Sequence, residues 1–213
     1  MRPYYDHDGI TIYHGDCREV LPCLGAETVD LVLTDPPYPK EFDHVWDAFG
    51  VDVPRVMKPE SFLVTMLGHY QLPRVMSACS ESLNYFWCAA TENNKCPILH
   101  GVMVKVNWKP VLVYRKGKAR PQRIWRDRFN VAAQTATWKR SRKLHKWGQS
   151  EAFFAEPLGA FCPPGCLVLD PFLGGGTILR VSKDLGYRAI GIEIEERYCE
   201  IAAERLRQGV LAF

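Results

Sequence analysis

Two segments of the 213-residue chain place chemically useful residues directly after apolar, strand-like runs. The first is Asp35-Pro36-Pro37-Tyr38, which follows the run Val29–Thr34. The Asp35 carboxylate can accept hydrogen bonds, the two prolines fix the backbone and remove two N–H donors, and the Tyr38 ring can stack on a ligand. The segment also fits a simple proline turn capped by Asp35, and the four residues alone leave both interpretations open.

The second segment is a glycine loop, Asp170-Pro171-Phe172-Leu173-Gly174-Gly175-Gly176-Thr177. Its glycines let a ligand approach the backbone closely, and a helix beginning there offers free N–H groups. It is not the Gly-x-Gly-x-x-Gly dinucleotide fingerprint, because the third glycine would fall at Leu179. The next strand-like run ends at Glu193, whose carboxylate can accept both hydroxyls of a ribose. Loop and acid together indicate an adenosine-bearing ligand, although Gly-Gly-Gly alone would also fit a tight turn.

Alternating apolar runs and helix-like segments must position these motifs. Strands are expected at 10–14, 29–34, 62–66, 85–90, 111–114, 166–170 and 189–193, and helices at 17–24, 177–185 and near the C-terminus. Gly186 fits a helix C-cap, and Tyr198, Ile201, Ala202 and Leu206 share one face of the last helix. This alternation predicts an α/β fold with an open, mostly parallel sheet. Such sheets bind ligands at the carboxyl ends of their strands, so the two motifs should share one edge.

Composition indicates an ordinary globular chain with one core, since 47% of the residues are apolar and 24% are charged. No stretch approaches the roughly 18 apolar residues of a membrane span. The N-terminus lacks the apolar core of a signal peptide, so a cytoplasmic protein without membrane contact is expected. The eight cysteines form no Cys-x-x-Cys pair, and Cys162 and Cys166 have no nearby histidine. We therefore expect reduced thiols and no metal site.

Positive charge is concentrated in one part of the chain. Residues 105–146 contain 14 Lys or Arg and the single acid Asp127, whereas the other residues hold 13 bases and 23 acids. The segment 115–148 also breaks the strand–helix alternation, so we interpret it as a basic insertion. A basic segment on an otherwise acidic chain favours a polyanionic partner over a merely solvated face.

In this order, the motifs resemble those of the amino-group DNA methyltransferases in their permuted arrangement, in which Asp-Pro-Pro-Tyr precedes Phe-x-Gly-x-Gly. The further matches, in chain order, are Gly15-Asp16-Cys17, Trp108-Lys109-Pro110, the segment from His145 to Gln149, Gly191-Ile192-Glu193, Tyr198 and Arg205. The resemblance covers nearly the whole chain, and the chain is similar to compact phage-type or bacterial members of the family. The His145 segment departs from the family's usual His-Pro followed by Lys-Pro.

This resemblance implies a Rossmann-like S-adenosylmethionine-dependent methyltransferase fold with a seven-stranded sheet, formed by residues 1–213 as one domain. It places Glu193 on the cofactor's ribose and Asp16 near its adenine, although Asp16 also fits a plain helix N-cap. The other implied cofactor residues are Asp170, Pro171, Phe172, Gly174, Gly176, Thr177, His145 and Gln149. The implied catalytic residues are Asp35, Pro36, Pro37 and Tyr38.

Double-stranded DNA is the implied partner, bound by a monomer or a homodimer. The 115–148 insertion is expected to read the DNA, because arginines interleaved with Gln122 and Trp125 can reach base edges or fill a vacated stack. The expected DNA-binding residues are Arg120, Arg123, Arg126, Arg128, Arg140 and Lys143. Some of these arginines could instead neutralise the acidic remainder of the chain.

The implied reaction is methylation of an exocyclic amino group, whose nitrogen is a poor nucleophile because its lone pair is delocalised into the base. The Asp35 carboxylate and the Pro36 carbonyl, held rigidly, would accept its two hydrogens and favour a pyramidal nitrogen. Tyr38 would stack on the base after the base has been flipped out of the duplex. The sulfonium methyl is already activated, so in-line positioning remains the main task.

Asp35 favours adenine N6 as the target over cytosine N4, because cytosine enzymes more often carry Ser-Pro-Pro. Cytosine C5 transfer needs a cysteine nucleophile, and Pro22-Cys23-Leu24 lies in an expected helix away from any strand end. RNA and protein-glutamine methyltransferases usually show Asn-Pro-Pro-Tyr without the permuted order. A DNA-binding protein on an inactive methyltransferase fold is the alternative from another class, and cofactor binding would discriminate it.

Overall fold

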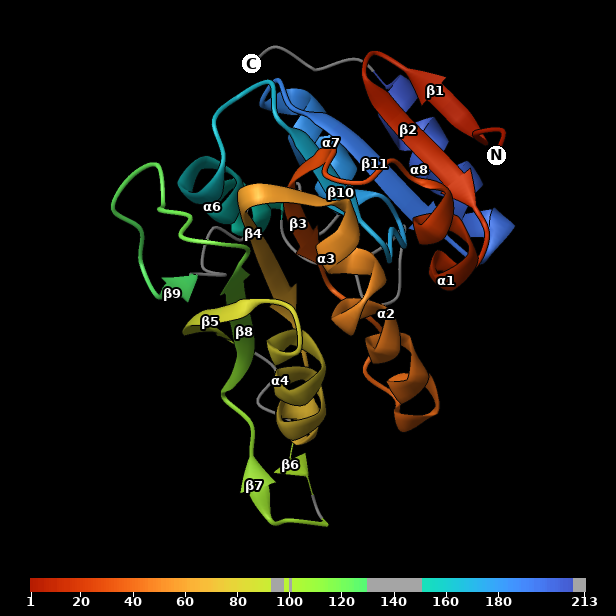
Figure 1. Ribbon diagram of the computed structural model, residues 1–213. Coiled ribbons are helices and arrows are strands. Elements are labelled where there is room, and N and C mark those ends of the chain that lie inside the picture. Colours follow the sequence, from red (N-terminus) through yellow and green to blue (C-terminus); the bar gives the residue numbers. More distant parts are fainter. Residues whose placement is uncertain (93–97, 100, 130–150, 209–213) are drawn as a thin grey trace.

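The computed structural model describes residues 1–92, 98–99, 101–129 and 151–208 (Figure 1). The strands are β1 (Tyr5–His7), β2 (Ile10–His14), β3 (Val29–Thr34), β4 (Met57–Met66), β5 (Asn84–Glu92), β6 (Ile98–Leu99), β7 (Val104–Lys105), β8 (Trp108–Arg115), β9 (Arg128–Phe129), β10 (Leu167–Asp170) and β11 (Arg188–Glu193). The α-helices are α1 (Cys17–Val20), α2 (Asp47–Gly50), α3 (Asp52–Val56), α4 (Leu72–Ser80), α6 (Glu151–Phe161), α7 (Thr177–Asp184) and α8 (Glu196–Arg207). Three short 3₁₀ helices cover Leu21–Cys23, Lys40–Trp46 and His69–Gln71.

One large sheet organises the described part of the chain, with the strand order β1-β2-β11-β10-β3-β4-β8-β5-β9. The five central strands from β2 to β4 are all parallel, whereas β8 runs antiparallel to both β4 and β5. The prediction of an open, mostly parallel α/β sheet is therefore confirmed.

The seven expected strands form the body of this sheet, but the described sheet has nine. The two additional strands, β1 and β9, lie at its edges and contain three and two residues. Such short strands carry too little alternation of apolar and polar residues to be recognised in a sequence. The turn between β1 and β2 uses Asp8 and Gly9, both with positive φ, which suits a tight hairpin.

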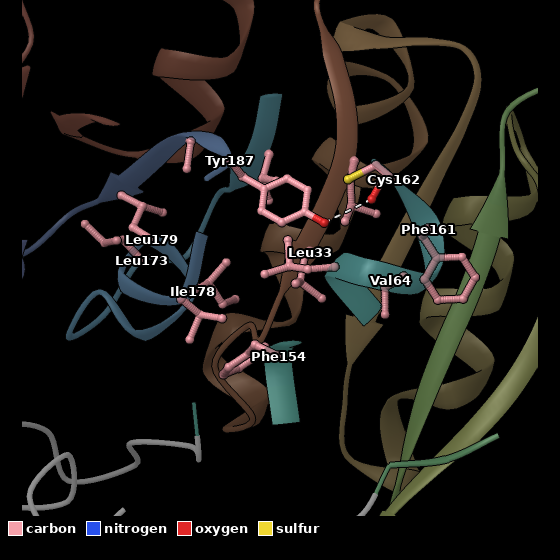
Figure 2. Close-up of a cluster of buried hydrophobic side chains, with 14 of the residues drawn as sticks. Leu33, Val64, Phe154, Phe161, Cys162, Leu173, Ile178, Leu179 and Tyr187 are labelled. Carbon is pink, nitrogen blue, oxygen red and sulfur yellow. Dashed lines mark hydrogen bonds between the residues drawn. The ribbon is translucent and has the colours of Figure 1, made fainter. Parts of the chain in front are cut away.

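Helices cover both faces of the sheet, and successive strand residues point to opposite sides. Phe62 and Val64 of β4 face the cluster formed with α6, α7 and α8, whereas Leu63 faces the cluster formed with α1 to α4. Figure 2 shows part of the first cluster, which includes Phe154 and Phe161 of α6 and Val64 of β4. The Tyr187 hydroxyl in this cluster donates a hydrogen bond to the Cys162 carbonyl, 3.1 Å away.

Helix α6 was not expected, because Pro157 and Gly159 fall inside it. A proline in a helix interior removes one hydrogen bond and disfavours the helix. The buried side chains Phe154, Leu158 and Phe161, spaced by four and three residues, pack on the sheet and offset this cost. Among the helices of the described residues, none is long and apolar enough to cross a membrane.

Candidate active site

Four acidic side chains lie at the carboxyl ends of four adjacent parallel strands. In sheet order these are Asp16 after β2, Glu193 at the end of β11, Asp170 at the end of β10, and Asp35 after β3. Both motifs lie at one edge of the sheet, as predicted, because β3 and β10 are direct parallel neighbours, with Val168 opposite Leu31. An α/β sheet binds its ligands at this edge.

A pocket of about 860 Å³ opens at this edge, within the size range of small-molecule sites. The predicted residues that line it are Asp16, Asp35, Pro36, Pro37, Tyr38, Asp170, Pro171, Phe172, Gly174, Thr177 and Glu193. Both motifs thus border one continuous space. His145 and Gln149 lie outside the described residues.

Asp170 connects the two motifs physically. Its Oδ1 accepts hydrogen bonds from the Thr34 hydroxyl at 2.7 Å and from the Phe172 backbone N–H at 3.1 Å. The pKa of Asp170 is raised to about 7, mainly by burial; the nearby carboxylates Asp35 and Glu193 also raise it, and the two hydrogen bonds lower it. This carboxyl group therefore joins the strand that presents Asp35 to the loop that begins at Pro171.

Glu193 holds the glycine loop through its carboxylate. Its Oε2 accepts from the Gly174 N–H at 2.8 Å and its Oε1 from the Glu195 N–H at 2.9 Å. Burial raises the pKa of Glu193, while these backbone hydrogen bonds act in the opposite direction. Each carboxylate oxygen has a second lone pair, so both can still accept a hydroxyl from a ligand in the pocket.

Gly176 supports the loop rather than lining the pocket. Its φ is +75°, and a Cβ at this position would lie 2.7 Å from the Cβ of Ala202 in α8. Arg205 of the same helix donates hydrogen bonds to the Gly175 carbonyl and the Thr177 hydroxyl, each at 3.1 Å, and pairs with Glu151 of α6. Helix α8 therefore fixes the shape of the loop from behind.

Asp35 and Tyr38 are in direct contact in this structure. The Tyr38 hydroxyl donates to Asp35 Oδ1 at 2.5 Å, and burial followed by the Asp35 charge raises the pKa of Tyr38 well above its usual value. The Lys109 ammonium lies 4.3 Å from the centroid of the Tyr38 ring. The Tyr38 hydroxyl thus occupies one acceptor position of the Asp35 carboxylate, and the Lys109 ammonium covers one face of the Tyr38 ring.

Asp16 caps helix α1, as the alternative interpretation of this residue predicts. Its side chain accepts from the Arg18 N–H at 2.9 Å and pairs with the Arg18 guanidinium, whose hydrogen bond is the main cause of the lowered Asp16 pKa. Asp16 also lines the pocket, so the capping role and a ligand contact are compatible.

The pocket has further walls that sequence reasoning missed. Phe42, Tyr70, Phe154 and Ile194 add apolar surface, and they come from separate segments brought together only by folding. Ile194 is 62% exposed and Tyr70 is 46% exposed, so large apolar groups surround the mouth of the pocket. Of these four residues, only Ile194 carried a signal in the sequence, because it directly follows a predicted strand.

The arginines expected to bind DNA have different surroundings. Arg120, Arg123, Arg126 and Arg128 are all exposed, and Arg123 also pairs with Glu156 at 3.0 Å and donates to the Gly159 carbonyl. Trp125, expected to contact bases, packs on Phe129 and Phe161 at the edge of the core, with ring centroids 5.9 Å and 5.1 Å away. Arg140 and Lys143 lie outside the described residues.

The residues at this edge fit a nucleoside cofactor. The Glu193 oxygens are held by backbone amides and line the pocket, Gly174 exposes bare backbone because it has no side chain, and Phe172 stacks on Phe49 with ring centroids 6.2 Å apart. An acid, a bare backbone and an immobilised ring are the groups that bind ribose and a planar base.

Solved structures share this architecture. A PvuII DNA methyltransferase described as cytosine-N4-specific matches with a TM-score of 0.82 and 19% identity, over 99% of this chain and 91% of that one. An M1.HpyAVI–SAM complex matches with a TM-score of 0.76 and 22% identity, over 93% of this chain and 100% of that one. The fold is therefore the Rossmann-like fold of S-adenosylmethionine-dependent methyltransferases.

Sequence comparison identifies the family. The N6/N4 methyltransferase model, described as DNA methylase, matches residues 29–204. The type II methyltransferase M.HinfI of Haemophilus influenzae is 23% identical, over 93% of this chain and 68% of the relative. M.HpaI of Haemophilus parainfluenzae is 26% identical, over 88% of this chain and 71% of the relative. The chain belongs to this family of S-adenosylmethionine-dependent DNA methylases.

Proposed function

We propose that this protein transfers a methyl group from S-adenosylmethionine to N6 of an adenine flipped out of duplex DNA. The observation that carries the proposal is that Asp35, Glu193 and the glycine loop border one continuous pocket. A methyl donor bound over the loop and a base at Asp35 would occupy the same space, as direct transfer requires.

The cofactor half of the pocket extends from Asp16 to the glycine loop. Glu193 accepts the ribose hydroxyls with its free lone pairs, Asp16 lies near the adenine, and Phe172 provides a fixed apolar wall. Asp170 acts as a positioning residue, because it joins Thr34 to the Phe172 N–H. The cofactor supplies a methyl group on a positively charged sulfur, and the surrounding carboxylates favour binding of that charge.

The base half is built from Asp35, Pro36 and Tyr38. The Asp35 carboxylate and the Pro36 carbonyl accept the two amino hydrogens, which concentrates the nitrogen lone pair toward the methyl group. The Tyr38 hydroxyl helps to orient the Asp35 carboxylate, and the Tyr38 ring stacks on the base. No covalent bond between protein and base would be needed: the nitrogen itself would attack the methyl carbon, the methyl–sulfur bond would break to leave a neutral thioether, and the nitrogen would lose one proton, for which the Asp35 carboxylate is an acceptor.

The choice of adenine rests on Asp35, where cytosine-N4 enzymes more often carry Ser. Cytosine N4 is the second candidate, since it needs the same two acceptors and one matching structure is described as cytosine-N4-specific. We further propose that residues 1–213 form one methyltransferase domain, in which the basic insertion 115–148 binds and reads the DNA.

Nucleoside analysis tests the proposed target. Purified protein is incubated with duplex DNA and isotopically labelled S-adenosylmethionine, and the digested DNA is analysed by mass spectrometry. We expect labelled N6-methyladenine. Labelled N4-methylcytosine alone would move the function to the second candidate, and labelled 5-methylcytosine would contradict the mechanism, because C5 transfer requires a cysteine nucleophile.

A further inference from the structure

A small hairpin stands apart from the main sheet. Among the described strands, β6 and β7 pair with each other alone, with Ile98 opposite Lys105 and Leu99 opposite Val104. Figure 1 shows this hairpin as an arm that projects past the end of the sheet where β8 begins. Because β8 is antiparallel to β4, with Val111 opposite Met66, this is also the edge where β4 ends and the active site opens.

The tip of this arm presents apolar side chains to solvent. Val102 is 66% exposed and Met103 is 82% exposed, and β7 continues with Val104, which is half exposed. Met103 also has a φ of +54°, a left-handed conformation that residues with a Cβ rarely adopt. Gly101, two residues earlier, does not occupy this strained position. A strained backbone that holds a large apolar side chain in water points to a function for that side chain.

The arm lies close to the base half of the pocket. Lys109, at the start of β8, is 4.3 Å from the Tyr38 ring, and Met103 is six residues before it. An extended chain of that length spans at most about 20 Å, so the tip lies within reach of a duplex whose base enters at Tyr38. Between the tip and the sheet, the rings of Trp108 and His69 pack edge to face with centroids 4.6 Å apart, and both residues line a cavity of about 340 Å³.

We propose that the tip formed by Val102 and Met103 is a wedge that inserts into the base stack of duplex DNA beside the target base. This inference rests on the proposed function. Flipping a base costs its stacking and pairing energy and leaves a gap in the duplex. Methionine and other apolar side chains inserted at such steps take over part of the lost stacking contact.

The charges beside the tip favour DNA as the occupant. Lys105 is the last residue of β7 and Lys109 lies over the Tyr38 ring, and both can contact phosphates on either side of an inserted wedge. A second copy of the chain is the less suitable occupant. Stable protein interfaces bury roughly 800 Å² per partner, far more than a tip of two side chains offers.

The test compares a double variant, Val102→Ser with Met103→Gly, with the control Val51→Ser. Glycine accepts the positive φ of residue 103, so the turn is retained. Val51 has the same 66% exposure as Val102 but lies between α2 and α3 and does not line either cavity. Two duplexes carry the site found by sequencing DNA methylated by the protein, one with the target base paired and one with an abasic position opposite it.

Single-turnover methylation should be at least about tenfold slower for the double variant on the paired duplex, because the target base must be unpaired and unstacked before transfer. On the abasic duplex, where the cost of unpairing is largely absent, its rate should return to within about threefold of the unmodified protein. Val51→Ser should match the unmodified protein on both duplexes, and cofactor affinity should not change in any variant.

Equal slowing on both duplexes, or no slowing on either, would overturn the wedge. Sedimentation velocity on the same samples tests whether a second copy of the chain covers the tip instead. A dimer that becomes a monomer in the double variant would show that the tip contacts another copy and would overturn the wedge. Absence of methylation by the unmodified protein on every DNA would remove the proposed function together with the wedge. Methylation that is unaffected by the tip substitutions would remove the wedge alone.

Discussion

The carboxyl groups at the sheet edge have different chemical surroundings although they line one pocket. Asp170 is buried and receives two hydrogen bonds, Glu193 receives two backbone amides, and Asp35 is half-buried against Tyr38. Their mutual repulsion adds to burial in raising the pKa of Asp170. The most buried acid thus acts as a structural junction, and the two less buried acids line the pocket.

This difference predicts a pH-dependent stability that Asp170→Asn removes. The folded pKa of Asp170, about 7, lies above its ordinary 3.8, so the folded state binds this proton more tightly than the unfolded state. Stability from this group is complete below about pH 4 and is lost as the pH rises toward 7, by an amount on the order of a few kcal/mol. Melting temperatures across this range should fall less steeply for the variant, which keeps an acceptor for Thr34. An identical fall of melting temperature with pH in both proteins would show that the group responsible is not Asp170.

Glu193→Ala should weaken cofactor binding more than it slows transfer at saturating cofactor. Loss of the ribose contact and of the Gly174 hydrogen bond should raise the KM for S-adenosylmethionine by about 10- to 100-fold, since hydrogen bonds to charged groups contribute about 1.5–3 kcal/mol. Glu200→Ala, on the exposed side of α8, removes the same charge as a control. A fall in kcat with an unchanged KM would contradict the ribose role.

At the scale of elements, the glycine loop depends on close packing between α7 and α8. The loop turns sharply into α7 at Gly176, whose backbone touches Ala202. Arg205, one turn further along α8, binds the loop carbonyl and pairs with Glu151. The loop geometry is therefore set by the packing of α6, α7 and α8 around it.

Gly176→Ala should lower the free energy of unfolding by on the order of 2–4 kcal/mol, through a disfavoured φ and a close contact with Ala202. Ala202→Gly removes the contacting Cβ at a cost of about 1 kcal/mol for a helical glycine. In the double variant we expect part of the loss to be recovered, so the two changes should couple by about 1 kcal/mol in denaturant unfolding. Strict additivity would show that the backbone angle alone constrains Gly176.

Elements with local sequence signals could be predicted, and those that depend on tertiary packing could not. Buried strands such as β3 and β10 are continuous apolar runs, and Gly186 with a φ of +77° ends α7 as its sequence position suggests. Helix α6 contains Pro157, and the two-residue strands carry no periodicity. The same limit applies to the site. Consecutive motif residues were found, whereas Phe154 and the Arg205–Glu151 pair reach the pocket region only through the fold.

At the scale of the whole molecule, the charge asymmetry predicts a salt-dependent attraction to DNA. Arg120→Ala with Arg126→Ala should reduce DNA affinity, and each lost phosphate contact should flatten the slope of log K against log salt by about 0.9. Arg123→Ala is the matched control, because Arg123 pairs with Glu156. It should change the salt slope less and stability more. If only Arg123→Ala flattened the salt slope, Arg120 and Arg126 would not lie on the DNA-binding surface.

The division of the pocket into a base half and a cofactor half is tested most directly by Asp35→Ala. Cofactor affinity measured by calorimetry and single-turnover methyl transfer are determined on the same preparation. We expect transfer to fall by at least about 10²- to 10³-fold, the typical loss for a group that stabilises developing charge, with the cofactor Kd changed by less than about threefold. Loss of cofactor binding together with transfer would place Asp35 in the cofactor half and contradict the account.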